Sequence, residues 1–155
     1  SDFKVTFDIP KSTLECVEFA SIVLSPKELS IYQLFIELAK VGKVFSIYDD
    51  VENACAWDAF SDEYLVLQKH YGNDNQKVEE QNKQQILDRV RETVSHVKKK
   101  LKENNLGPYV DNFVILSIQN GKAHLLPIKP ENITIIEDDL PPEGRDLAWA
   151  TRVYD

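Results

Sequence analysis

The sequence predicts an α+β domain in which a mixed or mostly antiparallel sheet of about five or six strands packs against two main helices. Three observations lead to this prediction. Lys4–Ile9 alternates strictly between polar and apolar residues, helical periodicity begins near Glu79, and Asn120-Gly121 separates two apolar runs. The chain has 155 residues, so we expect one globular domain over residues 1–155. Residues 137–155 are predicted to be an extended acidic tail docked on that domain.

The long helix and the hairpin after it have the clearest local signals. One apolar stripe should run along the helix, formed by Ile86, Leu87, Val90, Val94, Val97 and Leu101. Residues 104–108 (Asn-Asn-Leu-Gly-Pro) should end this helix, because Pro cannot continue it. Asn120-Gly121 favours a type I′ turn, so Phe113–Ile118 and Lys122–Ile128 should pair as strands. Because Phe113–Leu116 does not alternate, we expect a central strand covered on both faces.

A second helix is predicted to begin after Ser25. Ser25, Pro26 and Glu28 suit the N-cap, the first and the third helical positions. The helix should run to about Val41, with Gly42 as its C-cap. Its apolar residues occupy more than one face, so we expect it to be well buried.

The other segments have weaker patterns. Lys43–Tyr48, Tyr64–His70 and Asn132–Ile136 are predicted to be strands, and Ala54–Phe60 either a strand or a short helix. Ser12–Glu15 matches a capping box, which predicts the start of a short helix.

The chain is acidic, with a net charge of −8. This argues against direct binding of nucleic acid or of an anionic membrane, since both require dense Lys and Arg, and it favours a basic protein partner. We recognise no secretory signal, transmembrane stretch or lipidation motif, so we expect an intracellular protein, cytoplasmic or nuclear. Cys16 and Cys55 have apolar neighbours and are expected to be buried free thiols. The oligomeric state is not indicated.

No pattern predicts catalytic residues, a metal site or a cofactor. His70, His96 and His124 lack the short spacing of zinc ligands, and the glycines are scattered singly rather than gathered in a phosphate loop. The basic run Lys98–Lys102 is expected to be a solvated helix end that complements the helix dipole. We therefore lean towards a non-enzymatic protein, and an active site assembled from residues distant in sequence is the alternative.

The segment from Val44 to Gln68 has no Lys or Arg, but it contains acids and aromatic residues. Acids around an aromatic anchor suit a surface for a basic partner, because the anchor supplies buried area and the acids supply steering. The predicted partner-binding residues are Asp49, Asp50, Glu52, Trp57, Asp58, Phe60, Asp62, Glu63 and Tyr64. The alternative is that the acids solvate loops while Trp57 belongs to the core.

The tail contains a second acidic segment, Glu137-Asp138-Asp139, followed by Pro141-Pro142. A Pro-Pro pair favours extended backbone, which could dock on a partner or on the protein itself. We expect docking on the protein's own surface through Leu147 and Trp149.

Two families share features with this chain. Trp57-Asp58-Ala59-Phe60, followed by further strand and helix patterns, resembles the barstar group of nuclease inhibitors, which is acidic and presents a similar helix. This chain lacks that group's aromatic-Gly-x-Asn lead-in before the motif. Separately, the order helix, two strands, helix and a strand pair around Ile115–Ile128 resembles the tRNA-splicing endonuclease fold, including its non-catalytic subunits.

We therefore expect a non-enzymatic protein-interaction domain, acting as a subunit or adaptor of a larger assembly through its acidic surface. The first alternative is an immunity or nuclease-inhibitor protein that masks a basic partner. The second is a non-catalytic subunit with a nuclease-like fold.

Overall fold

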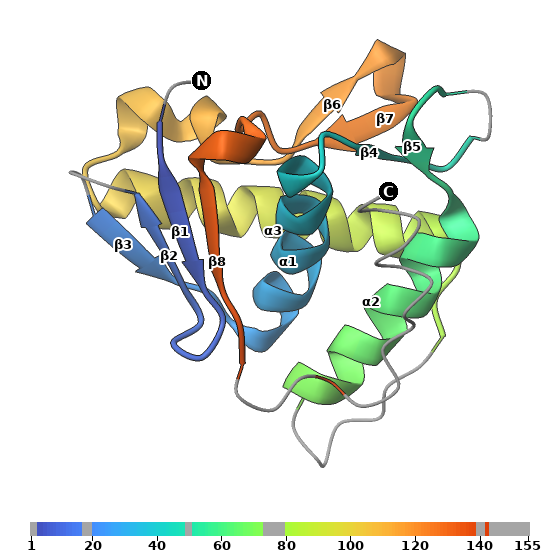
Figure 1. Ribbon diagram of the computed structural model, residues 1–155, viewed down its shortest axis with the longest axis horizontal. Coiled ribbons are helices and arrows are strands. Elements are labelled where there is room, and N and C mark those ends of the chain that lie inside the picture. The colour runs from blue at the N-terminus through green and yellow to red at the C-terminus, as the bar shows by residue number, and fades with distance from the viewer. Residues whose placement is uncertain (1–2, 17–19, 49–50, 73–79, 139–141, 143–155) are drawn as a thin grey trace.

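The computed structural model describes residues 3–16, 20–48, 51–72, 80–138 and 142. It confirms the predicted α+β class, with three α-helices in these ranges. The strands form two four-stranded mixed sheets, and not the one larger sheet that we expected. Figure 1 shows the first sheet on the left of the molecule and the second at the upper right, with helices between and behind them.

Each sheet combines parallel and antiparallel pairs. The first has the order β3-β2-β1-β8, in which only β8 is parallel to its neighbour β1. The second has the order β5-β4-β7-β6, in which β5 is parallel to β4. The bounds are Val5–Asp8 (β1), Thr13–Cys16 (β2), Ala20–Val23 (β3), Val44–Ser46 (β4), Ala54–Cys55 (β5), Leu116–Ile118 (β6), Ala123–Leu125 (β7) and Ile133–Ile136 (β8).

Helix α1 (Pro26–Lys40) lies at the centre of the fold and begins where the sequence predicts. The Glu28 N–H donates to Ser25 Oγ at 3.3 Å, and the Ser25 N–H donates to the Glu28 carboxylate at 2.8 Å, which completes a capping box. The helix ends before Gly42, whose φ of 72° suits a glycine. All residues from 28 to 39 are buried, because α2, α3 and the second sheet pack around this helix.

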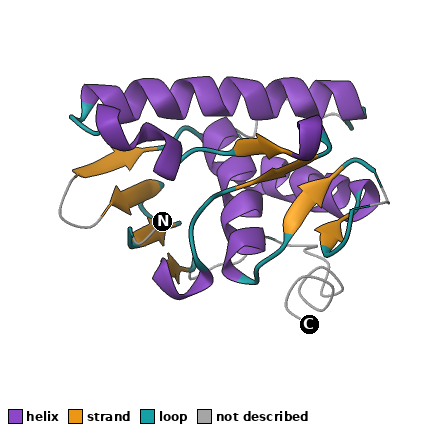
Figure 2. Cartoon of the chain, turned by 90° about the horizontal axis from the view of Figure 1, so that it is seen from above, coloured by secondary structure: helices purple, strands orange, loops and turns teal. Residues whose placement is uncertain are grey.

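Helices α2 (Trp57–Tyr71) and α3 (Lys83–Glu103) both pack against α1. Figure 2 shows α3 spanning most of the width of the molecule. Its buried face consists of Ile86, Val90, Thr93, Val97 and Leu101. Four residues of the predicted stripe are therefore confirmed, while Leu87 and Val94 are half-buried. Within the described ranges, three short 3₁₀ helices complete the fold: η1 (Gly107–Asn112), η2 (Gln119–Gly121) and η3 (Pro130–Asn132).

The prediction of a strand at Tyr64–His70 is wrong, because these residues belong to α2. The alternation at Leu65 and Leu67 covers few residues. The wider spacing of Phe60, Tyr64 and Leu67, all buried, fits one face of a helix. The segment Ala54–Phe60 contains both a strand and the start of a helix, because β5 ends at Cys55 and α2 begins at Trp57.

Two other local predictions are also wrong. Ser12–Glu15 does not begin a helix, because Ser12 lies in a tight turn with a φ of 54° and Thr13–Cys16 is strand β2. Phe113–Leu116 does not form a central strand. The residues before Leu116 are buried in irregular backbone, where the Phe113 carbonyl accepts a hydrogen bond from Tyr32 Oη at 3.2 Å. Strand β6 itself is an edge strand.

The predicted hairpin turn is confirmed. Strands β6 and β7 are antiparallel, and the Lys122 N–H donates to the Gln119 carbonyl at 3.2 Å. Asn120 and Gly121 between them have φ values of 58° and 84°, as a type I′ turn requires. In the part of the chain that the structure describes, no helix is long and apolar enough to cross a membrane.

Candidate protein-binding surface

The predicted partner-binding residues lie in and before the first turns of α2, and they differ in how exposed they are to solvent. Asp49 and Asp50 lie outside the described residues. Glu52, Asp58 and Asp62 are exposed. The other four residues are half-buried or buried: Trp57, Phe60, Glu63 and Tyr64.

Phe60 and Tyr64 point into the core, because both lie on the buried face of α2. The Phe60 ring stacks on Phe45 with centroids 3.8 Å apart and meets Phe35 edge to face. Tyr64 is 2% exposed, and this burial raises its pKa, although the nearby Arg89 guanidinium opposes the shift. These two aromatic side chains position α2 and are not available as partner contacts.

Trp57 is the one aromatic residue of the predicted set with exposed surface. It packs partly against the hydrophobic core, and the Lys83 ammonium lies 5.8 Å from its ring centroid. Trp57 therefore connects the start of α2 to the start of α3. Trp57 is therefore partly a core residue and partly a surface residue beside the exposed acids, so each of the two interpretations of it applies in part.

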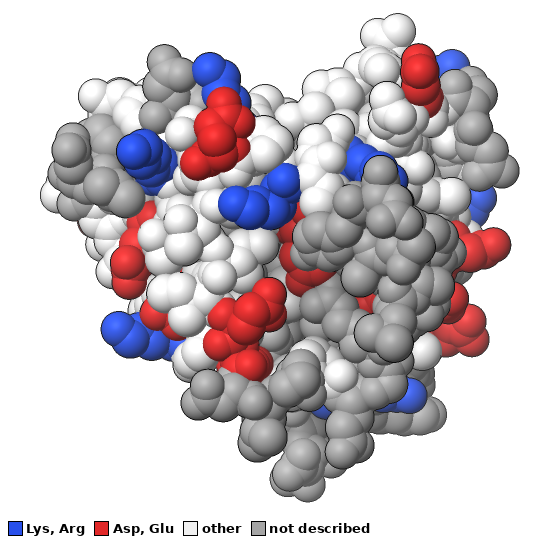
Figure 3. Space-filling model, viewed as in Figure 1, with Lys and Arg blue, Asp and Glu red and all other residues white. Residues whose placement is uncertain are grey.

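Asp58 and Asp62 are one helical turn apart and lie on the exposed side of α2. Among the residues that the structure describes, neither forms an ion pair. The acids of α3 differ, since Asp88 pairs with Arg91 at 3.2 Å and Glu92 with Arg89 at 2.8 Å. Figure 3 shows acidic side chains along the edge of the molecule over α2. We call Glu52, Asp58 and Asp62 the acidic face.

One of these acids, Asp58, stabilises the start of α2. Ala56 occupies the N-cap and makes no side-chain cap hydrogen bond. Asp58 lies in the first turn, where a carboxylate complements the positive end of the helix dipole. Asp62 lies beyond that turn, so the dipole gives it little compensation for its proximity to Asp58.

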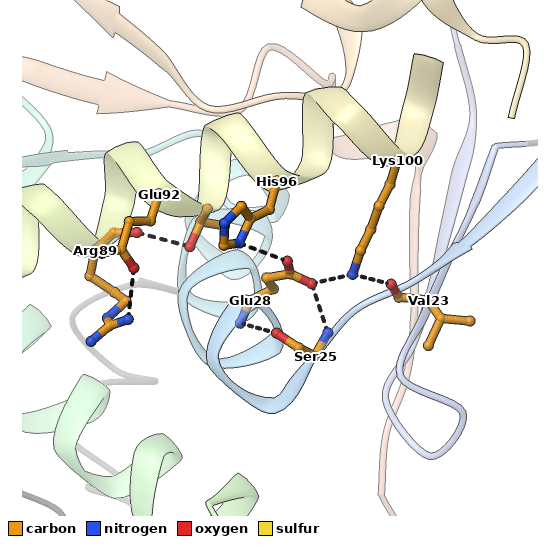
Figure 4. A network of polar contacts seen from close by, with 8 residues as sticks. Val23, Ser25, Glu28, Arg89, Glu92, His96 and Lys100 are labelled. Atoms are coloured by element: carbon orange, nitrogen blue, oxygen red, sulfur yellow. Dashed lines mark hydrogen bonds and ion pairs between the residues drawn. The ribbon is translucent and has the colours of Figure 1, made fainter. Parts of the chain in front are cut away.

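Sequence reasoning missed a second polar network, which centres on Glu28 (Figure 4). The Glu28 carboxylate accepts a short hydrogen bond from Lys100 Nζ and lies 3.3 Å from His96 Nδ1. Lys100 Nζ also donates to the Val23 carbonyl at 2.7 Å. The capping-box signal at Ser25 identified Glu28 as an N-terminal residue of α1, but nothing local indicates its partners on α3.

Burial would by itself raise the pKa of Glu28, but the hydrogen bonds from Lys100 and Ser25 lower it below its ordinary value. The carboxylate is thus charged, buried and satisfied. This network joins helix α1 to helix α3.

A further polar chain crosses the contact between α1 and α2. His70 Nε2 lies 3.3 Å from Asp138 Oδ2, and the neighbouring Tyr71 Oη donates to Gln33 Oε1 at 2.7 Å. Gln33 Nε2 in turn donates to Glu37 Oε1 at 2.8 Å. His70 therefore has a carboxylate partner, and this pair attaches the segment after β8 to the end of α2.

The remaining candidate chemistry is sparse. Cys16 and Cys55 are buried free thiols, as expected, and burial raises the pKa of Cys16 to about 12. His124 is half-buried on β7, where burial and the nearby Arg91 lower its pKa. No described cluster of His, Cys, Asp or Glu residues is arranged to hold a metal ion.

Comparison with protein-family models, curated proteins and solved structures gave no match to this chain. The element order also differs from that on which the endonuclease resemblance rests, because the additional helix α2 stands between strands β4 and β5 and the long helix α3. The barstar-like residues 57–60 do begin a helix.

Proposed function

We propose that this chain is a non-enzymatic protein-interaction domain, a subunit or adaptor of a larger assembly, and that it binds a basic partner through the acidic face. The observation that carries this proposal is the exposed pair Asp58 and Asp62. Two like charges one turn apart weaken a helix by about 0.2–0.5 kcal/mol. An arrangement that costs stability and forms no ion pair within the described residues fits a binding role better than a structural one.

The way α2 is held supports the same proposal. Phe60 and Tyr64 fix one side of the helix in the core, so the carboxylates on its other side have a defined spacing. A partner with Lys or Arg at matching positions would meet preorganised charges and would lose little entropy in ordering them. The net charge of −8 adds long-range attraction to a basic protein.

The test is a pull-down from the native source with wild-type chain and with the double variant Asp58→Lys, Asp62→Lys. We expect the variant to lose the specific partner, with an affinity reduced by at least about tenfold. Asp111→Lys with Glu131→Lys is the matched control, because it makes the same charge change at exposed positions elsewhere. Equal binding by both folded variants would refute the assignment of the acidic face.

A second candidate function follows from the position of the barstar-like residues. Trp57-Asp58-Ala59-Phe60 begins a helix, with Asp58 exposed and Phe60 buried. A protein of this kind would cover the basic active site of a nuclease. This candidate requires a small basic toxin as partner, with an association rate that falls steeply as salt is raised. A partner that has no nuclease activity would exclude it and leave the adaptor role.

A further inference from the structure

Strand β8 forms one edge of the first sheet, and among the described residues no strand pairs with the outer side of its backbone (Figure 1). The Ile9 N–H donates to the Ile136 carbonyl at 3.0 Å, so Ile136 and Thr134 direct their backbone groups towards β1. Ile133 and Ile135 therefore direct theirs away from the sheet. Within the described residues, no group bonds to the N–H or the carbonyl of Ile135.

The side chains of this strand suit pairing with another strand. Ile133–Ile136 carries no charge and is β-branched throughout, and Ile136 is 42% exposed. Figure 3 shows mainly uncharged surface over the middle of β8, with charged side chains at both ends. An unpaired edge strand with uncharged, β-branched side chains is a template for pairing with another chain.

Lys40, in the last turn of α1, closes the upper part of this edge. Its Nζ donates to the Ile133 carbonyl at 2.6 Å and lies 3.3 Å from the Pro130 carbonyl. The opposite edge of the sheet has the same device, since Lys100 Nζ donates to the outward Val23 carbonyl of β3 at 2.7 Å. A lysine on an edge carbonyl blocks strand addition, because a new strand would have to displace the ammonium group.

We propose that the edge of β8 is a latent pairing surface for a second copy of this chain, and that Lys40 keeps it closed. An antiparallel arrangement with a two-fold axis at Ile135 lets each Ile135 N–H donate to the other copy's carbonyl. The same register places Thr134 opposite Ile136 of the second copy. A second copy fits because its β8 edge offers the same uncharged surface and the complementary backbone groups.

The test is the self-association of Lys40→Met, measured by sedimentation over a wide range of concentrations. Loss of the ammonium group should strengthen dimer formation about tenfold relative to wild type, the factor that corresponds to one or two net hydrogen bonds. Lys40→Arg retains a donor and should behave like wild type. Lys69→Met, an exposed lysine of α2, is the control for loss of charge alone.

A second variant shows whether the dimer forms at β8. Thr134→Lys with Ile136→Lys, added to Lys40→Met, puts like charges directly opposite across the proposed pair and should restore the monomer. Both side chains are exposed, so the fold should tolerate the change. The proposal is overturned if Lys40→Met associates no more than wild type, or if its dimer survives the added lysines. If Lys40→Met associates more weakly than wild type, Lys40 itself contacts the second copy, and the proposal is overturned as well.

Discussion

Glu28 joins α1, α3 and the edge of β3 through one buried carboxylate, since it bonds Lys100, which also bonds Val23. Glu28→Gln keeps the size of the side chain but removes its charge. We expect it to lower the free energy of unfolding by about 2 kcal/mol in urea denaturation. Glu92→Gln is the matched control, because its pair with Arg89 is exposed and should be worth less than about 0.5 kcal/mol. Equal losses in the two variants would contradict a special role for Glu28.

The same carboxyl predicts how stability depends on pH. Its folded pKa is lowered from the ordinary value of 4.5, so near that pH the folded chain binds fewer protons than the unfolded chain. The stabilisation is therefore complete above that value and is lost as the pH falls towards the folded pKa. Thermal unfolding measured from neutral to acidic pH should show a steeper loss for wild type than for Glu28→Gln. Parallel curves would show that this group does not contribute.

At the scale of the elements, α2 carries a trade-off between stability and binding. Asp62→Lys replaces a repulsive pair with an attractive one, Asp58 and Lys at helical spacing, and should stabilise the fold by about 0.5 kcal/mol. The same variant should bind the partner more weakly. Denaturation and binding measured on one preparation test both effects. A variant that is less stable than wild type would indicate that Asp62 has a structural role.

The buried side of α2 should behave in the opposite way. Phe60 is fully buried and stacks on Phe45, so Phe60→Ala should cost about 3–5 kcal/mol. Val66 is half-buried on the same helix, and Val66→Ala should cost clearly less. Calorimetric unfolding of the two variants measures the difference. Similar costs would mean that Phe60 is not the anchor of α2.

Elements with a local signal could be predicted from the sequence. The Ser25 capping box sets the start of α1, and Asn120-Gly121 sets the turn between β6 and β7, because each needs only neighbouring residues. The strand predicted at Tyr64–His70 fails because a few alternating residues cannot be distinguished from a helix face. The central strand predicted at Phe113–Leu116 fails for another reason. Consecutive buried residues occur in irregular backbone inside a core as well as in a central strand, and the sequence does not distinguish the two.

Of the candidate site, the sequence predicts only the negative charge. The absence of Lys and Arg around Asp58 is visible in the sequence, whereas the side of α2 that faces solvent depends on packing against α1. For that reason the sequence pattern predicts Phe60 and Tyr64 in the binding surface, although both lie in the core. The bond between Glu28 and Lys100 links residues 72 positions apart, and no local pattern indicates it.

At the scale of the whole molecule, the acidic face and the net charge of −8 act together on association. Charges beyond the contact itself accelerate encounter with a basic partner, and salt screens them within roughly 10 Å at moderate ionic strength. We expect the association rate to fall as salt is raised, while the dissociation rate changes little. Stopped-flow mixing with the captured partner measures both rates. A salt-independent association rate would contradict electrostatic steering.

Photo-crosslinking from α2 tests the central claim most directly. A benzoylphenylalanine placed at position 62, with position 111 as the matched exposed control, reports which surface the partner touches in extracts of the native source. A crosslink to one basic protein from position 62, and none from position 111, is the predicted result. Crosslinks to that protein from position 111 alone, or equally from both positions, would contradict the claim that the acidic face of α2 binds the partner.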